Sequence, residues 1–253
     1  MEVIAKHKWL VRPSQMGSLM SKGRSKDVLF GETAMKVIQE AVVMHKFGIE
    51  PEHIETKEME KGTLNEPQNI ELATQVLGWK GVSADQSKRR WANDFMIGEP
   101  DVCTDNLLAD IKSSWSPKTF HWFPKKTIDK NYYAQLQSYM SLTGHKQAEL
   151  VYCLSNHPAH ILEAEIKRKT HYYVDRPFLF DAESIDDLWT KAEMKATEEV
   201  NKVGIIDHVP INNRVQRYVI ERDDAYIDQM HERIIEARKI FDELYIKLTN
   251  QNK

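Results

Sequence analysis

The segment GEPDVCTDNLLADIK, residues 98–112, is the most informative stretch of this 253-residue chain. Asp105-Asn106 is a turn-forming pair, and runs of strand-forming residues lie on both sides of it, so the segment predicts a β-hairpin. We expect its strands over residues 99–104 and 107–113.

The hairpin carries a cluster of charged side chains. Residues two apart in a strand project from the same face, so Asp110 and Lys112 are expected together while Ile111 points into the core. Asp101 lies on the partner strand, where its carboxylate can converge with that of Asp110. Two adjacent carboxylates repel each other unless a hard cation such as Mg²⁺ neutralises them. The alternative interpretation is a surface turn that carries a salt bridge.

Two flanking features favour the metal site. Glu66 is expected in the first turn of a helix over residues 65–77, where it either faces the metal or interacts with the helix dipole. Gln135 and Tyr139 are four apart, on one face of a helix over residues 131–143. Both side chains could belong to the metal site. The alternative is that Gln135 is an ordinary solvated helix residue and Tyr139 is a core residue.

This ordered pattern resembles the PD-(D/E)XK nucleases, with Pro100-Asp101 and Asp110-Ile111-Lys112 filling their motif. The Gln135-x-x-x-Tyr139 helix is similar to that of the RecB-type subgroup. The segments YYAQLQSYM (132–140) and YVIERD (218–223) look like the phage lambda exonuclease family, also called viral recombinase nucleases. The similarity is weakest from residue 173 to 208, which an insertion would explain.

The resemblance implies an α/β fold, a mixed β-sheet flanked by helices, with a long C-terminal helix. It implies Mg²⁺-dependent hydrolysis of one strand of linear duplex DNA from the 5′ end, in phage-type recombination, with Mn²⁺ as a substitute. The matching acidic positions and the helix glutamine are Glu66, Asp101, Asp110 and Gln135. Lys112 matches the catalytic lysine, and the carbonyl of Ile111 could supply a further metal ligand.

DNA contacts are implied less directly. Ser14, next to Arg12, resembles a serine that contacts the 5′-terminal phosphate, but Glu99 replaces a second phosphate-binding serine. An upstream arginine also lacks a match, although Lys6 or Lys8 could substitute. Lysines interleaved with aromatic residues in the loop 117–130 suit a frayed single strand, or else those aromatics pack over the sheet edge. The expected DNA-contacting residues are Arg12, Ser14, Lys118, Lys125, Lys126 and Tyr139.

Composition limits the remaining possibilities. The net charge of −3 excludes DNA binding by bulk charge alone. Two cysteines are too few for an iron–sulfur cluster, a four-cysteine zinc site or a disulfide framework. No stretch approaches about 18 apolar residues, and no signal peptide is evident, so we expect a cytoplasmic protein without a membrane span.

We expect a single domain over residues 1–253. Further helices are expected over residues 33–47, 158–173, 185–203 and 223–248, and further strands over 149–154 and 215–220. The apolar stripe of the last helix has coiled-coil spacing, although packing within its own domain is the favoured interpretation.

Several functions stay open. The favoured one is a 5′–3′ exonuclease, and an endonuclease or flap nuclease of the same superfamily is the alternative. A non-catalytic subunit that binds DNA ends belongs to a different class. Lambda-type members form toroidal trimers, so a homo-oligomer is expected, and a single-strand annealing protein is a candidate partner.

Overall fold

A four-stranded mixed sheet forms the centre of the computed structural model, which describes residues 9–23, 28–52, 55–84 and 89–250. Its strand order is β3-β4-β5-β6, with β4 and β5 parallel and both outer pairs antiparallel. The expected mixed sheet is therefore confirmed. The strands are β3 (Val102–Cys103), β4 (Leu108–Ser113), β5 (Gln147–Cys153) and β6 (Val215–Glu221).

Helices α3 (Lys57–Leu77) and α4 (Lys130–Thr143) cover opposite faces of this sheet. Alternation along β4 explains why. Ile111 faces Ile70 on α3, whereas Leu108 packs with Leu136 on α4. Asp110 and Lys112 share the parity of Leu108 and therefore project on the α4 side.

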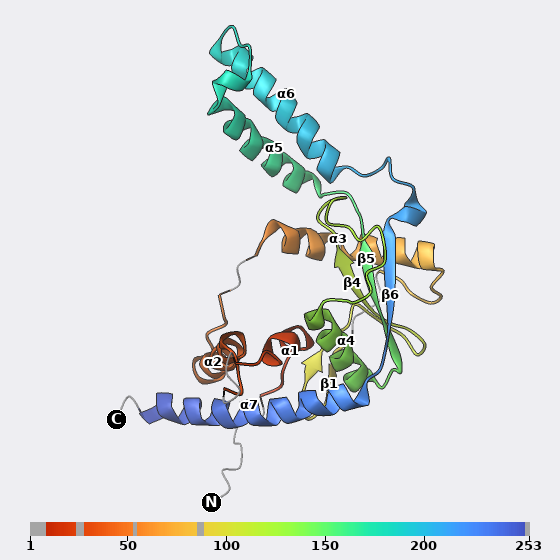
Figure 1. The fold of residues 1–253 in the computed structure, drawn as a ribbon, viewed down its shortest axis with the longest axis vertical. Coiled ribbons are helices and arrows are strands. Elements are labelled where there is room, and N and C mark those ends of the chain that lie inside the picture. Colours follow the sequence, from red (N-terminus) through yellow and green to blue (C-terminus); the bar gives the residue numbers. More distant parts are fainter. Residues whose placement is uncertain (1–8, 24–27, 53–54, 85–88, 251–253) are drawn as a thin grey trace, which may run out of the picture.

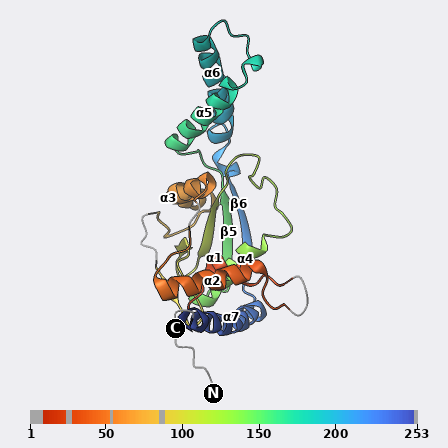
Figure 2. The same ribbon diagram turned by 90° about the vertical axis from the view of Figure 1, so that its left-hand side faces the viewer.

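A second core lies below the sheet (Figures 1 and 2), between α1 (Pro13–Leu19), α2 (Glu32–Phe47) and α7 (Asp224–Asn250). The apolar stripe of α7 is buried there, which confirms packing within its own chain. Its buried members are Ile227, Met230, Ile234, Ala237 and Phe241.

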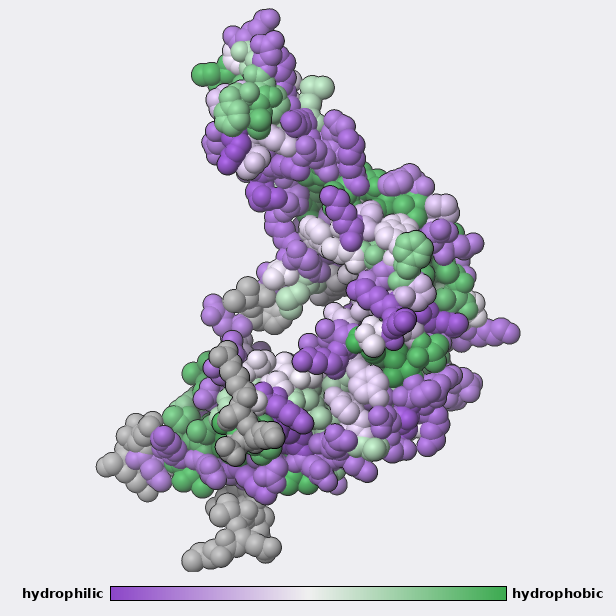
Figure 3. All heavy atoms as spheres, viewed as in Figure 1, coloured by the Kyte–Doolittle hydropathy of each residue, from purple (hydrophilic) through white to green (hydrophobic). Residues whose placement is uncertain are grey.

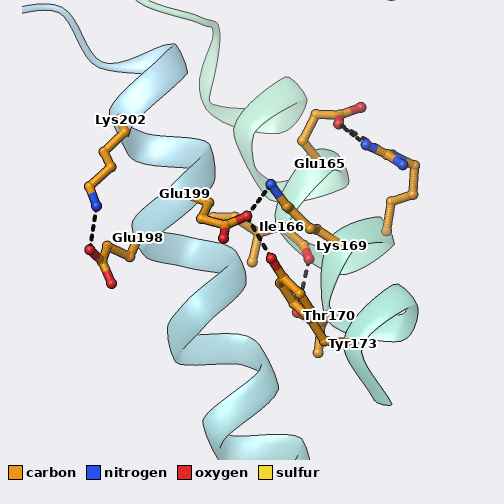
Figure 4. A network of polar contacts seen from close by, with 9 residues as sticks. Glu165, Ile166, Lys169, Thr170, Tyr173, Glu198, Glu199 and Lys202 are labelled. Carbon is orange, nitrogen blue, oxygen red and sulfur yellow. Dashed lines mark hydrogen bonds and ion pairs between the residues drawn. The ribbon is translucent and has the colours of Figure 1, made fainter. Parts of the chain in front are cut away.

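A helical hairpin of α5 (Ala159–Val174) and α6 (Ile185–Gly204) projects away from the sheet (Figure 1). Polar contacts join its two helices (Figure 4). Glu199 accepts a hydrogen bond of 2.7 Å from the hydroxyl of Tyr173 and forms an ion pair with Lys169. Short helical turns, η1 (Pro177–Leu179) and η2 (Ile211–Asn213), lie in the loops that follow α5 and α6.

Two boundary predictions were wrong. Helix α3 begins at Lys57, not at residue 65, because the side chain of Thr56 caps it by accepting from the N–H of Met59. Asn65, expected as the first residue of this helix, is a buried residue inside it, where it donates to Ser155 and to the carbonyl of Asn156.

The first hairpin strand is shorter than expected. Residues 99–101 connect β3 to a small separate ladder of β1 (Trp91–Ala92) and β2 (Ile97–Gly98), which the sequence pattern did not predict. Within the described residues, no helix is both long and apolar enough to cross a bilayer.

Candidate active site

The hairpin brings Asp101 and Asp110 together through its register. Val102 pairs with Ala109, so the position of Asp101 falls opposite that of Asp110. One carboxylate oxygen of Asp101 accepts a hydrogen bond of 2.7 Å from the backbone N–H of Ile111. This contact fixes Asp101 against the middle of β4.

Asp110 is almost fully buried, with 1% of its side-chain surface exposed, so an unpaired charge there would be costly. Two neighbours offset that cost. Nζ of Lys112 lies 2.7 Å from Oδ2, and Nε2 of Gln135 donates to Oδ1 at 3.0 Å. Three predicted site residues from β4 and α4 thus form one connected network.

The pKa of Asp101 is shifted by its burial and by the neighbouring carboxylates. Burial raises its pKa to about 7, and repulsion from Asp110 and Glu66 acts in the same direction. The hydrogen bond from Ile111 and the charge of Lys112 oppose this rise only in part. The pocket therefore holds more negative charge than its own lysine neutralises.

Glu66 reaches the same pocket from α3. It lies in the middle of that helix, so its expected position in the first turn was wrong, and the alternative interpretation, an interaction with the helix dipole, does not apply. The pocket has a volume of about 630 Å³. All the residues predicted to form the catalytic and metal site line this pocket: Glu66, Asp101, Asp110, Ile111, Lys112 and Gln135.

Lys112 is held as an ammonium ion. Burial alone would lower its pKa, but the charge and the hydrogen bond of Asp110, with the charge of Asp101, raise it overall. Its Nζ also lies 4.9 Å from the ring centre of Tyr132 on α4. A cationic Lys112 can orient a nucleophile or offset negative charge, whereas it lacks the lone pair of a base.

Lys61 is a residue of α3 that sequence reasoning missed. It is 1% exposed, and its Nζ donates to the carbonyls of Ser114, Trp115 and Ser155. Burial lowers its pKa to about 7, while three acceptors favour its charged form. These bonds fix the helix that carries Glu66 against the ends of β4 and β5.

The spacing of polar residues in the sequence already indicated the buried position of Lys61. Lys61, Asn65 and Asn69 recur every four residues and are all buried on one face of α3. Hydrophobic periodicity does not register such a stripe, because its members are polar.

The donor set suits a divalent cation. Carboxylates and a backbone carbonyl are the oxygen ligands that Mg²⁺ and Mn²⁺ take, and mutual repulsion among carboxylates is what a bound cation relieves. Among the described residues, no three acidic, histidine or cysteine side chains already form a metal-binding group. Asp110 instead contacts Lys112 and Gln135.

The residues expected to contact DNA are more scattered. Arg12 and Ser14 are exposed at the start of α1 and do not line the acidic pocket. Lys6 and Lys8 lie outside the described residues. Tyr139 is buried at 6% exposure, and its hydroxyl lies 3.4 Å from both Gln135 and the carbonyl of Glu99.

Lys118, Lys125 and Lys126 are exposed in the loop that precedes α4. Of these, Lys125 lines a second hollow beside the acidic pocket. The aromatic residues of this loop differ in exposure: Phe123 is 84% exposed, whereas Phe120 is buried with Leu154 and Ile206.

The space-filling view shows the molecular surface hollowed between α3 and the layer that contains α1 and α2 (Figure 3). Close packing of α1 and α4 against the end of β2 depends on Gly98. A Cβ atom there would lie 2.5 Å from Cγ of Pro13 and 3.2 Å from the ring of Tyr139. Only glycine lets α1 and α4 approach the segment that leads into Asp101.

The fold is that of phage-type exonuclease structures. The phage-related exonuclease from Haemophilus somnus 129PT superposes with a TM-score of 0.68 at 22% identity, over 96% of this chain and 97% of that one. The alkaline exonuclease LHK-Exo from Laribacter hongkongensis gives 0.57 at 15% identity, over 96% and 93%. LHK-Exo in complex with dAMP gives 0.56 at 16% identity, over 99% and 97%.

Those likenesses confirm at the level of the fold the resemblance inferred from the hairpin and the glutamine helix. No protein-family model and no curated protein matches the chain.

Proposed function

We propose that this protein is a metal-dependent deoxyribonuclease that hydrolyses the phosphodiester bonds of linear duplex DNA, acting as a 5′–3′ exonuclease. One observation carries the proposal. Three acidic side chains, from α3 and from both sides of the hairpin, line one pocket together with the half-buried Lys112 and a glutamine. The likeness to exonuclease structures, one of them holding dAMP, supports the same chemistry.

Glu66, Asp101, Asp110 and the carbonyl of Ile111 would hold one or two Mg²⁺ ions, with Mn²⁺ as a substitute. When bound, such an ion activates water and stabilises charge on phosphate oxygens. The chain's own residues do the positioning. Gln135 holds Asp110 in place through its amide, and the ammonium of Lys112 orients the nucleophile and offsets charge that develops on the phosphate.

The biological setting is proposed on the same basis. The protein would act on double-stranded DNA ends in phage-type recombination, in the cytoplasm of a bacterial or phage-infected cell. It would do so as a single nuclease domain in a homo-oligomer, with a trimer as the first candidate and a single-strand annealing protein as partner.

The test is a digestion time course on linear duplex DNA labelled at either the 5′ or the 3′ end. The proposal expects mononucleotides in Mg²⁺, released first from the 5′ label, and no product in a chelator. A covalently closed circle of the same sequence is the control substrate. Cleavage of the circle would instead identify an endonuclease, and binding of ends without cleavage in either metal would identify a non-catalytic subunit.

A further inference from the structure

A second hollow, of about 470 Å³, opens beside the acidic pocket. The two hollows share Tyr132 and Tyr152 as walls. Its volume lies in the range of sites that hold small organic ligands. The residues that line it come from the loop before α4, from α4 itself and from β5 and β6, and they include His121, Lys125, Asp129, Tyr132, Tyr152 and Tyr218.

Aromatic rings form much of this wall. The ring centre of Tyr152 lies 4.2 Å from that of His121, 6.0 Å from that of Tyr218 and 6.3 Å from that of Tyr132. All four side chains are partly exposed. Such a group differs from a closed aromatic core, because its rings still offer surface to a ligand.

Positive charge and fixed loop geometry accompany the rings. Nζ of Lys125 lies 2.8 Å from Nε2 of His121, and since an ammonium only donates, the imidazole accepts. The backbone N–H of Lys125 donates to the hydroxyl of Tyr218 at 3.1 Å. These contacts hold the loop against β6, with a lysine at the mouth of the hollow.

We propose that this hollow binds an unpaired nucleobase of the DNA strand next to the scissile phosphate, with Lys125 contacting the backbone. The proposal rests on the function proposed above, which places a DNA strand in the adjoining pocket. Unpaired bases stack on aromatic side chains that line a groove, and an adjacent cation contacts the phosphate. Contiguity through Tyr132 and Tyr152 joins this subsite to the hydrolytic pocket.

The experiment measures binding in a chelator, so that it does not depend on hydrolysis. The probes are a fluorescent single-stranded oligothymidylate of about eight nucleotides and an abasic oligonucleotide of equal length. The unaltered protein should bind the first roughly 5- to 100-fold more tightly, the range expected for one stacked base. Equal affinity for both probes would overturn the proposal without any substitution.

Variants then locate the effect. Tyr218→Leu should lose most of the preference for the base-containing probe, whereas Tyr218→Phe, which keeps the ring, should retain it. Trp189→Leu is the matched control, since Trp189 is 39% exposed on α6, outside the lining of this hollow. An undiminished preference in a folded Tyr218→Leu protein would contradict the assignment.

Hydrolysis is scored separately, with the unaltered protein, linear DNA and Mg²⁺. If hydrolysis is absent but the base preference depends on Tyr218, the subsite stands and the proposed function fails. If hydrolysis occurs without a base preference, the proposed function stands and the subsite fails.

Discussion

The amide of Gln135 donates a hydrogen bond of 3.0 Å to Oδ1 of Asp110, and this contact joins α4 to β4, the second strand of the hairpin. The other oxygen of Asp110 faces Lys112 at 2.7 Å. A carboxylate held on both sides has little freedom to rotate. Its direction is therefore set before any cation or substrate arrives, which is what a metal ligand and a phosphate site require.

Replacing Gln135 should impair this arrangement without unfolding the chain. Gln135→Leu removes the donor to Asp110 and should lower nuclease activity, or raise the Mg²⁺ concentration needed for it, by roughly 10- to 100-fold. A Mg²⁺ titration of initial rates on linear DNA measures this. Gln229→Leu, at an exposed position of α7, is the control and should match the unaltered protein.

We expect nuclease activity to require the positive charge of Lys112 at its position in the pocket. Lys112→Met should lower kcat by roughly 100- to 10,000-fold, since it removes the only lysine that lines the acidic pocket among the residues that the structure describes. Lys112→Arg should recover little, because a planar guanidinium does not fit the position of an ammonium. Lys202→Met on α6 is the comparison. Near-normal rates in Lys112→Met would remove this residue from the chemistry.

The raised pKa of Asp101 predicts a pH dependence of stability in the protein without divalent ions. Its folded pKa of about 7 exceeds the ordinary value of 3.8, so the folded state binds the proton more tightly. Protonation of Asp101 therefore stabilises the fold. The contribution is complete below about pH 4 and is lost as the pH rises through about 7.

Denaturant titrations from about pH 5 to about pH 8 measure this effect. The difference between the unaltered protein and Asp101→Asn isolates the contribution of one residue. Asp181→Asn, an exposed substitution beyond α5, should leave the pH profile unchanged. Mg²⁺ should flatten the profile of the unaltered protein, because a cation replaces the proton as the partner of the carboxylates. An Asp101→Asn profile parallel to that of the unaltered protein would refute this account of the pocket.

We expect Lys61 to contribute mainly to the stability of the fold. Lys61→Met leaves the buried carbonyls of Ser114 and Ser155 without their donor, whereas the carbonyl of Trp115 keeps its contact with His157. This loss should lower the free energy of unfolding by about 3 kcal/mol. Lys36→Met on the exposed face of α2 should change it by less than about 0.5 kcal/mol. Equal stability of the two variants would show that Lys61 does not anchor α3.

The residue pattern was sufficient for the hairpin and for the grouping of its charged residues, whereas the mixed sheet was expected from the family resemblance. Strand alternation placed Asp110 and Lys112 on one face and Ile111 in the core, and the structure has them there. These inferences succeeded because the two-residue period of a strand and a tight turn leave few arrangements open.

The start of α3 could not be predicted in the same way. The helix was expected to start at residue 65, but tertiary contacts of Lys61 and Asn65 hold it helical from further upstream. Local propensity is a weak guide where buried polar contacts decide the outcome. The aromatic hollow was also out of reach, since Tyr152 and Tyr218 meet His121 only through strand pairing and loop packing.

Direct measurement of cation binding tests the central claim, that Glu66, Asp101 and Asp110 together hold a divalent ion. Titration of the protein with Mn²⁺, followed by the paramagnetic signal of the free ion, gives affinity without any nuclease assay. We expect saturable binding by the unaltered protein and its loss in the double variant Asp101→Asn plus Asp110→Asn, with that variant still folded. Equal Mn²⁺ affinity in the two proteins would contradict the claim.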